Sequence, residues 1–400
     1  MSIQADLQNP ELGYHDEGMS LTDPGLYEST RQAFGLATSL SPVAFRSKTF
    51  LELESEKVWT RSWAAIGLLQ QIPRSGDLLP FTLGFHGLHV QRNNDGTVAA
   101  RMNRHQHGGC RFVPVQCRTG MQTKCSITSC NYTRDADAMS AGESGENTDE
   151  MFKFAGLVPE KLHPVKFECW GPLILVNLDP ASGQLADQLG AMLPQLPSWF
   201  QGPHSIRAKL WLDVKANWKE MGAVFMDGAE IDVRVPDGQC PDFATGTFDV
   251  ASESGSGLLL SALGGKPHVS LFWAFPNLLI AASDDHALVV ILQSTAPGKT
   301  LCRLFLIAPD DLPEKRAAGL SFAWIDRFKN RVARAETLHQ DHALHGTASR
   351  PGTKLSEQPR ENLRGSYLLN LFLSLRLCTE HKYYWTAPIM DAAMLMRGVR

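Results

Sequence analysis

The chain has 400 residues, of which 43% are hydrophobic and 20% are charged, a balance typical of a folded globule and not of extended disorder. At about 150 residues per domain, this length predicts two domains or one large one. Its 38 basic and 42 acidic residues give a formal net charge of −4, so the composition excludes a strongly basic binder of nucleic acid or of an anionic membrane.

Residues 1–45 are polar, carry several Gly and Pro, and show no clear periodicity, which predicts an N-terminal arm that would lie on a neighbouring subunit. There is no Lys or Arg before Arg31 and no apolar core after Met1, so the features of a secretory signal are missing. No unbroken apolar stretch approaches the ~18 to 20 residues that cross a bilayer. We therefore expect a cytoplasmic protein without a membrane partner.

A small β-rich domain is predicted over residues 46–182. It starts with a helix over 47–63 and continues with short strands over 65–101, in which Asp95-Gly96 separates two alternating runs and predicts a hairpin. The polar stretch 134–149 predicts a loop, and the apolar run 169–180 predicts one buried strand that completes the domain.

A second domain is predicted over residues 183–400, together with part of 46–64. Its expected elements are a helix-like connection over 184–200, a strand over 205–216, a helix over 217–229, four strands over 256–309, and helices over 313–346 and 365–378. The order indicates an α+β fold, with a small antiparallel β domain followed by a helix-flanked antiparallel sheet.

Eight cysteines are too few for a disulfide framework, yet four of them cluster between positions 110 and 130. These are Cys110, Cys117, Cys125 and Cys130. Mixed His and Cys sets of this kind bind metals, so the cluster marks a candidate metal site.

Two segments near this cluster, Asn103-Arg-His-Gln-His-Gly-Gly-Cys110 and Cys125-Ser-Ile-Thr-Ser-Cys-Asn-Tyr132, carry a family resemblance. Together with Glu54 to Trp63, Gly76-Asp77, Trp170 to Pro180 and Asn217-Trp-Lys, they resemble, in order, the α subunit of Rieske-type non-haem iron oxygenases of the choline-monooxygenase-like and ring-hydroxylating group. The resemblance implies a Rieske-like β domain, a helix-grip-like second domain, and assembly as a trimer or hexamer.

In that family, two Cys and two His hold a [2Fe-2S] cluster. The matching positions in this chain are His105, His107, Cys125 and Thr128, so two of the four ligands are replaced and Thr is a poor ligand for ferric iron. We therefore expect no normal cluster. One alternative is a zinc site made by His105, His107 and Cys125 with Cys110 or Cys130, and the other is a pocket filled by side chains without any metal.

The family's second metal centre is a mononuclear iron held by two His and one carboxylate. The carboxylate that links the two centres falls on Asp227 or on the residue after it. The remaining matched positions are Glu230 or Ile231, Val235 or Pro236, and Glu336, and none is a histidine. An all-carboxylate site of Glu230, Asp232 and Glu336, helped by His339, His342 or His345, is disfavoured because histidines three residues apart fan around a helix. We expect those histidines on a solvated or subunit-facing side.

The sequence thus predicts a structural or regulatory subunit without its own cofactor, which pairs with a competent Rieske α-type subunit and, through that complex, with a reductase. One alternative is a Rieske-type mono- or dioxygenase or demethylase with atypical ligation, holding [2Fe-2S], iron or zinc. The other is a metal-free small-molecule binding protein. A Ser-His-Asp hydrolase is not indicated, because no G-x-S-x-G motif is present.

Overall fold

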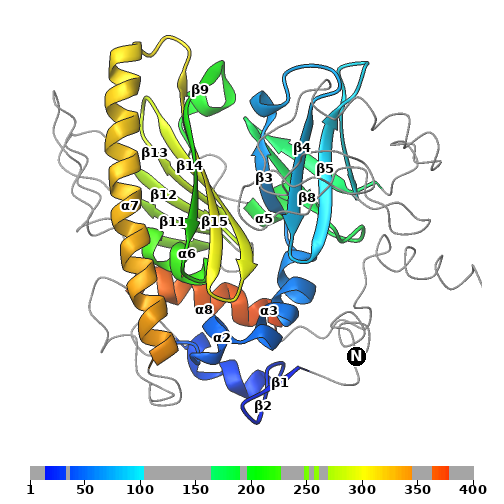
Figure 1. Ribbon diagram of the computed structural model, residues 1–400, viewed down its shortest axis with the longest axis vertical. Coiled ribbons are helices and arrows are strands. Elements are labelled where there is room, and N and C mark those ends of the chain that lie inside the picture. The colour runs from blue at the N-terminus through cyan, green and yellow to red at the C-terminus, as the bar shows by residue number, and fades with distance from the viewer. Residues whose placement is uncertain are drawn as a thin grey trace, which may run out of the picture. The chain divides into compact units, whose positions relative to one another are not determined.

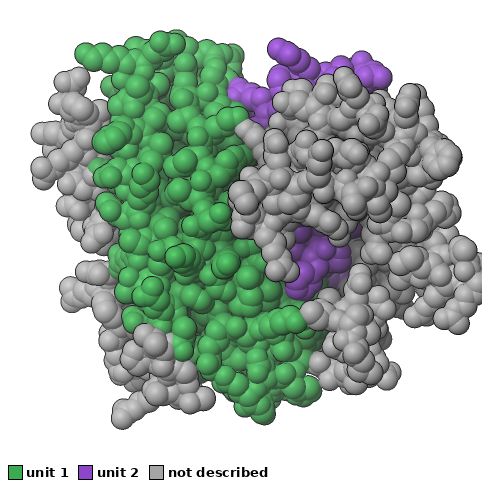
Figure 2. Space-filling model, in the orientation of Figure 1, with its two compact units in different colours: residues 1–58, 183–382 green, residues 59–182, 383–400 purple. Residues whose placement is uncertain are grey.

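The computed structural model describes residues 14–32, 37–102, 164–189, 196–226, 247–251, 256–260, 269–344 and 363–377. The chain divides into two compact units, coloured in Figure 2. Unit 1 comprises residues 1–58 and 183–382, and unit 2 comprises residues 59–182 and 383–400. The fold class is α+β, as predicted, because antiparallel sheets and long helices lie in separate parts of the chain.

Unit 2 contains two three-stranded antiparallel sheets in its described part, with orders β4-β5-β6 and β3-β8-β7. Their strands are β3 (Ala64–Leu68), β4 (Leu78–Leu83), β5 (His86–Arg92), β6 (Val98–Met102), β7 (Lys166–Trp170) and β8 (Leu173–Asn177). The predicted hairpin at Asp95-Gly96 is confirmed: it joins β5 to β6, and Gly96 has the positive φ of 82° that such turns require.

The single strand predicted over residues 169–180 is wrong. The structure has a hairpin there, in which β7 turns at Gly171 and returns as β8 with Trp170 opposite Leu173. Gly171 has φ 53°, in the left-handed region that glycine adopts without steric cost. The apolar run continues through the turn because β8 is buried along its whole length, and this hid the break.

Unit 1 is built on a seven-stranded antiparallel sheet with the order β10-β11-β12-β13-β14-β15-β9. The strands are β9 (His204–Val214), β10 (Thr247–Ala251), β11 (Ser256–Leu260), β12 (Ser270–Ala274), β13 (Leu278–Ala282), β14 (Ala287–Ala296) and β15 (Lys299–Pro309). The sequence predicted four strands over 256–309, whereas five of these strands fall there. The Gly, Pro, Asn and Asp residues in this stretch mark four breaks, at 264–265, 276–277, 283–285 and 296–298, and four breaks separate five runs, each of which forms its own strand.

Three helices accompany this sheet: α6 (Trp218–Met226), α7 (Glu314–Leu344) and α8 (Leu363–Leu377). All three were predicted, with ends that differ by at most three residues. Helix α6 is buried throughout and lies on the sheet, so closely that a Cβ added to Gly222 would be 2.3 Å from the Trp273 ring on β12. Figure 1 shows α7 as the long orange helix beside the strands. None of the helices in the described ranges is long and apolar enough to cross a membrane.

The helix predicted over 47–63 begins as expected. Ser47 caps α3 (Lys48–Glu54) by accepting a hydrogen bond from the Phe50 amide at 3.0 Å, and one more helical stretch, η4 (Ser55–Trp59), follows. A short helix that was not predicted, α2 (Val43–Arg46), comes just before it. The helix-like connection predicted over 184–200 contains two short helices, α5 (Leu185–Leu189) and η9 (Ser198–Gln201), and residues 190–195 between them lie outside the described residues.

Residues 14–32 of the predicted arm pack within their own chain. It forms the small hairpin β1 (His15–Asp16) and β2 (Met19–Ser20), followed by short 3-10 turns that contact α8. The guanidinium of Arg31 donates to the Ser374 carbonyl oxygen at 3.1 Å, which fixes the arm to α8.

Candidate functional site

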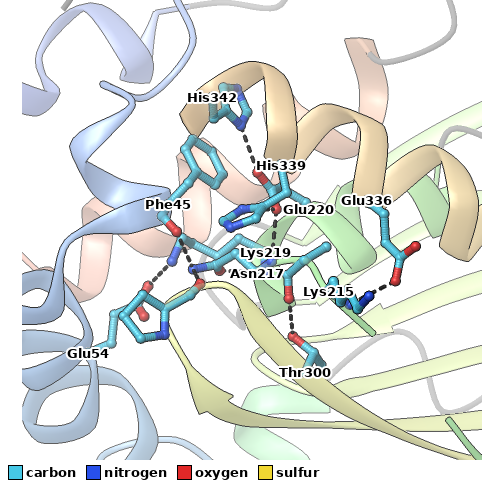
Figure 3. Close-up of polar contacts among 12 residues, drawn as sticks. Phe45, Glu54, Lys215, Asn217, Lys219, Glu220, Thr300, Glu336, His339 and His342 are labelled. Carbon is cyan, nitrogen blue, oxygen red and sulfur yellow. Dashed lines mark hydrogen bonds and ion pairs between the residues drawn. The ribbon is translucent and has the colours of Figure 1, made fainter. Parts of the chain in front are cut away.

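Most of the residues matched to metal ligands lie outside the described part of the chain. These are His105, His107, Cys125 and Thr128, the other clustered cysteines Cys110, Cys117 and Cys130, and Asp227, Glu230, Ile231, Asp232, Val235, Pro236 and His345. Their expected roles stay predictions. Glu336, His339 and His342 are described, and all three lie on α7 near the first turn of α6 (Figure 3).

The first turn of α6 is held by a capping box. The Asn217 side-chain oxygen accepts a hydrogen bond from the backbone amide of Lys219 at 3.1 Å. The backbone amide of Asn217 donates to Glu220 Oε2 at 2.8 Å. The side-chain Nδ2 of Asn217 donates to the carbonyl oxygens of Phe45 at 3.0 Å and Pro297 at 2.6 Å. Asn217 therefore joins α6 to the end of α2 and to the turn between β14 and β15.

A buried ion pair between α6 and α3 lies next to this capping box. Lys219 Nζ lies 2.6 Å from Glu54 Oε1 on α3, and Trp218 Nε1 donates to the other carboxylate oxygen at 3.1 Å. Burial raises the pKa of Glu54 and lowers the pKa of Lys219, although each charge partly offsets the effect on the other. The ammonium also lies over the rings of Phe45, Phe50 and Trp218 at 5.2 to 5.6 Å.

Glu220 is the centre of a second charged cluster. His339 Nδ1 lies 3.0 Å from its Oε2, and His342 Nδ1 lies 2.7 Å from its Oε1 (Figure 3). The Glu220 side chain is only 2% exposed. Burial by itself would raise the pKa of Glu220, but the hydrogen bonds from the two imidazoles outweigh it and hold this pKa below its ordinary value.

The expectation that the late histidines fan apart is therefore wrong for His339 and His342. They lie three residues apart on α7, a spacing that places them one turn apart on neighbouring positions, and both reach one carboxylate. His342 also stacks on the Phe45 ring, with ring centroids 4.4 Å apart and an angle of 13° between the planes. His339 Nε2 faces Gly298, where an added Cβ would be 2.4 Å away.

Helix α7 holds the other end of α6 as well. The Arg331 guanidinium donates to the carbonyl oxygens of Val224, at 2.9 Å, and of Phe225. These are among the last carbonyls of α6, which have no partner within the helix. Arg331 contacts the end of α6 while His339 and His342 contact its start, so the two helices run antiparallel and α7 fixes α6 at both ends.

Glu336 lies at the position matched to the family's third metal ligand, in a site that we expect to be lost. Its Oε1 accepts a hydrogen bond from the Lys215 amide at 2.8 Å, just before α6 begins. Its proposed partners Asp227 to Pro236 follow Met226, the last residue of α6. Among the described residues, no three His, Cys, Asp or Glu side chains form a group that could hold a metal ion.

A Ser, a His and an Asp also meet at the turn between β13 and β14. His286 Nδ1 lies 2.8 Å from Ser283 Oγ and 2.6 Å from Asp285 Oδ1. A catalytic triad needs the Ser and the Asp on different ring nitrogens, so this arrangement does not activate Ser283. Asp285 also pairs with Arg316 on α7, and the hydrogen bond from His286 is the main reason why the pKa of Asp285 falls to about 2.

The clusters around α6 therefore brace this helix against α2, α3 and α7. Sequence reasoning missed Glu220 as their centre. Its signal was the spacing Asn217-x-x-Glu220, which is typical of a capping box and was interpreted only as a family landmark.

Comparisons with known proteins agree with the resemblance. No family model matches the chain. The benzene 1,2-dioxygenase subunit alpha of Pseudomonas putida is 26% identical over 156 residues, which is 38% of this chain and 33% of that protein. The glycine betaine monooxygenase oxygenase subunit of Chromohalobacter salexigens is 24% identical over 182 residues, 45% of this chain and 39% of that protein. The matched regions thus span about a third of the length of these curated relatives.

The fold matches over a larger part. The quaternary ammonium Rieske monooxygenase CntA, solved with γ-butyrobetaine, has a TM-score of 0.64 at 14% identity, covering 89% of this chain and 98% of that one. Naphthalene 1,2-dioxygenase with bound indole has a TM-score of 0.62 at 15% identity, covering 94% and 98%. At these identities the likeness establishes the fold alone.

Proposed function

We propose that this chain, which is similar to Rieske oxygenase α subunits in sequence and in fold, is a non-catalytic member of that family, a structural or regulatory subunit that pairs with a catalytically competent α-type subunit. The observation that carries this proposal is the sequence after α6. In the family this region supplies two iron-binding histidines, and residues 227–246 of this chain contain none.

The residues present do not fit either metal group of the family. The cluster positions offer one thiolate, two imidazoles and the Thr128 hydroxyl, and Thr is a poor ligand for iron. Glu336, the remaining carboxylate, accepts the Lys215 amide hydrogen at the start of α6. A single carboxylate does not hold catalytic iron, so we assign no redox step to this chain.

The scaffold around the missing site is nevertheless maintained. Buried ion pairs cost desolvation energy and are stable only with good geometry, and the Glu54–Lys219 and Glu220–His339 contacts meet that condition. A chain that keeps α6 braced at both ends preserves the shape of a catalytic-type domain. This supports a role in completing the interface or substrate channel of a trimer or hexamer, in which the partner subunit supplies the metals and receives electrons from a reductase.

Metal and sulfide analysis of the purified chain tests the first half of the proposal. Expressed alone under conditions that load a competent Rieske α subunit used as positive control, the chain should be colourless and hold far less than one iron per chain. Two irons and two sulfides per chain, as a [2Fe-2S] cluster requires, would contradict it and favour an oxygenase with atypical ligation.

Co-expression tests the pairing. The chain and a tagged competent α subunit should co-elute at a fixed ratio, and the mixed complex should differ from the competent homomer in activity or stability. A chain that elutes alone, with the competent subunit unchanged in both properties, would contradict the pairing.

A further inference from the structure

We propose that Glu220, His339 and His342 form an acid-operated latch, which fixes the first turn of α6 to the end of α7 and releases it when the carboxylate takes up a proton. The proposal concerns this chain's own side chains and stands independently of the proposed function.

The hydrogen bonds of the Glu220 carboxylate depend on whether it is ionised or protonated. Glu220 Oε2 accepts hydrogen bonds from the Asn217 amide at 2.8 Å and from His339 Nδ1 at 3.0 Å, while Oε1 accepts one from His342 Nδ1 at 2.7 Å. Ionised Glu220 is an acceptor only and satisfies all three donors. A proton on Oε2, which already accepts two hydrogen bonds, would displace a donor, and a proton on either oxygen removes the charge that strengthens all three hydrogen bonds, so the protonated side chain holds the two imidazoles less strongly.

The charges around Glu220 favour its ionised form. On α6 itself, Lys219 attracts it, and that ammonium is shared with Glu54 on α3. From α7 the two imidazoles face it, and each donates through Nδ1. From α2 and from the β14–β15 turn the neighbours are Phe45 and Gly298, which carry no side-chain charge.

The opening should be local, because the other end of α6 is held by a group that does not titrate. Arg331 keeps its charge at every accessible pH, and its bonds to the Val224 and Phe225 carbonyls do not involve a carboxylate. Loss of the latch therefore frees the first turn of α6 while the last turn stays attached to α7. The latch therefore changes how the start of α6 is supported and leaves the contacts of its last described turn in place.

The direction of the pH effect follows from the pKa of Glu220, which lies below its ordinary value in the folded chain. In the unfolded chain this carboxyl group has a pKa near 4.5. Because the pKa is lower in the folded chain, ionised Glu220 stabilises the folded arrangement at pH values above 4.5. This stabilisation is lost as the pH falls through the pKa of the folded chain. Without the imidazole donors, burial would raise the pKa of Glu220, so the two histidines both form the latch and keep its carboxylate ionised.

Hydrogen–deuterium exchange of the full chain at a series of pH values tests the latch. Its readout is the protection of the first-turn amides of α6, corrected for intrinsic exchange, relative to that of β14. In the wild type, first-turn protection should fall on acidification before β14 loses protection. His339→Ala with His342→Ala removes both contacts between Glu220 and α7, so its first-turn protection should already be low at neutral pH and should not fall further in step with the wild-type transition.

Three further variants keep the test decisive. His339→Asn with His342→Asn retains a donor near each Nδ1 position and should restore part of the first-turn protection at neutral pH. Glu220→Gln resembles the protonated state and should show low, pH-independent first-turn protection. His204→Asn, which removes an imidazole bonded to the Gly202 carbonyl outside the latch, should leave the midpoint unchanged. Wild-type first-turn protection in the His339→Ala with His342→Ala variant, or pH-dependent protection in Glu220→Gln, would overturn the proposal.

Discussion

The ammonium group of Lys219 lies 2.6 Å from the carboxylate of Glu54, with exposed fractions of 0% and 1% for the two side chains. Removing one partner leaves the other charge buried without compensation, which typically costs about 3 to 5 kcal/mol. Lys219→Met should therefore lower the free energy of unfolding by this amount, measured by urea unfolding of the purified chain.

The matched double variant separates the lost pair from lost packing. In Glu54→Gln with Lys219→Met, both charges are absent and the Gln oxygen can still accept the Trp218 Nε1 hydrogen. Replacement of a whole buried pair by neutral groups is often nearly neutral, so the double variant should be more stable than Lys219→Met alone. A double variant as unstable as the single one would show that packing around the Lys219 stem, and not the charge, determines the loss.

The close approach of α6 to the sheet predicts opposite effects at two helical glycines. In Gly222→Ala the new Cβ would lie 2.3 to 2.9 Å from three atoms of the Trp273 ring, which is fully buried and cannot move freely. Overpacking of this kind costs about 1 to 3 kcal/mol. In Gly319→Ala on α7, no atom lies within 4 Å of the new Cβ, so the higher helix propensity of Ala should stabilise the chain by about 0.5 to 1 kcal/mol. Thermal unfolding should show a lower Tm than wild type for Gly222→Ala and a higher Tm for Gly319→Ala.

The parts of the fold that were predicted correctly depend on local signals. Asp95-Gly96 makes its turn with its own backbone, and the 3.6-residue period of 313–346 is visible without any other segment. The hairpin at Gly171 was also local, but a fully buried strand shows no alternation and the apolar run was interpreted as continuous. Element type was therefore easier to predict than the number of strands.

The clusters around α6 could not be predicted in the same way. Glu220 is 119 residues from His339 and 122 from His342, and the three meet only because α6 and α7 run antiparallel in contact. Helical spacing alone suggested that the histidines diverge. The spacing contains no information about Glu220, which lies on a second helix. Its two carboxylate oxygens each accept a hydrogen bond from one imidazole.

The turn between β13 and β14 predicts a pH-dependent contribution to stability. The hydrogen bond from His286, which outweighs the burial of Asp285, together with Arg316 holds the pKa of Asp285 at about 2, below its ordinary value of 3.8. Its contribution is fully present above pH 3.8 and is lost as the pH falls through 2. Because Asp285 is a third exposed, we expect Asp285→Asn to cost less than about 1 kcal/mol. Urea unfolding at several pH values should show a constant difference in the free energy of unfolding between wild type and variant above pH 4, and a smaller difference below it. Asp284→Asn controls for the loss of charge in the same turn.

A buried imidazole in unit 2 predicts the opposite kind of titration. His89 on β5 is fully buried, and burial, with a smaller effect of Arg101 across the β5–β6 pair, lowers its pKa to about 3 from the ordinary 6.5. Between these two values the unfolded chain binds a proton that the folded chain does not. The free energy of unfolding should therefore decrease as the pH falls below 6.5, by about 1.4 kcal/mol per pH unit for one proton. In His89→Gln this part of the slope should vanish, even if the variant is less stable at pH 7. Hydrogen exchange of the β5 amides between pH 4 and 7 measures the slope in unit 2 itself. His86→Gln removes an imidazole from the start of the same strand, and an equal loss of slope in that control would show that burial of His89 is not the cause.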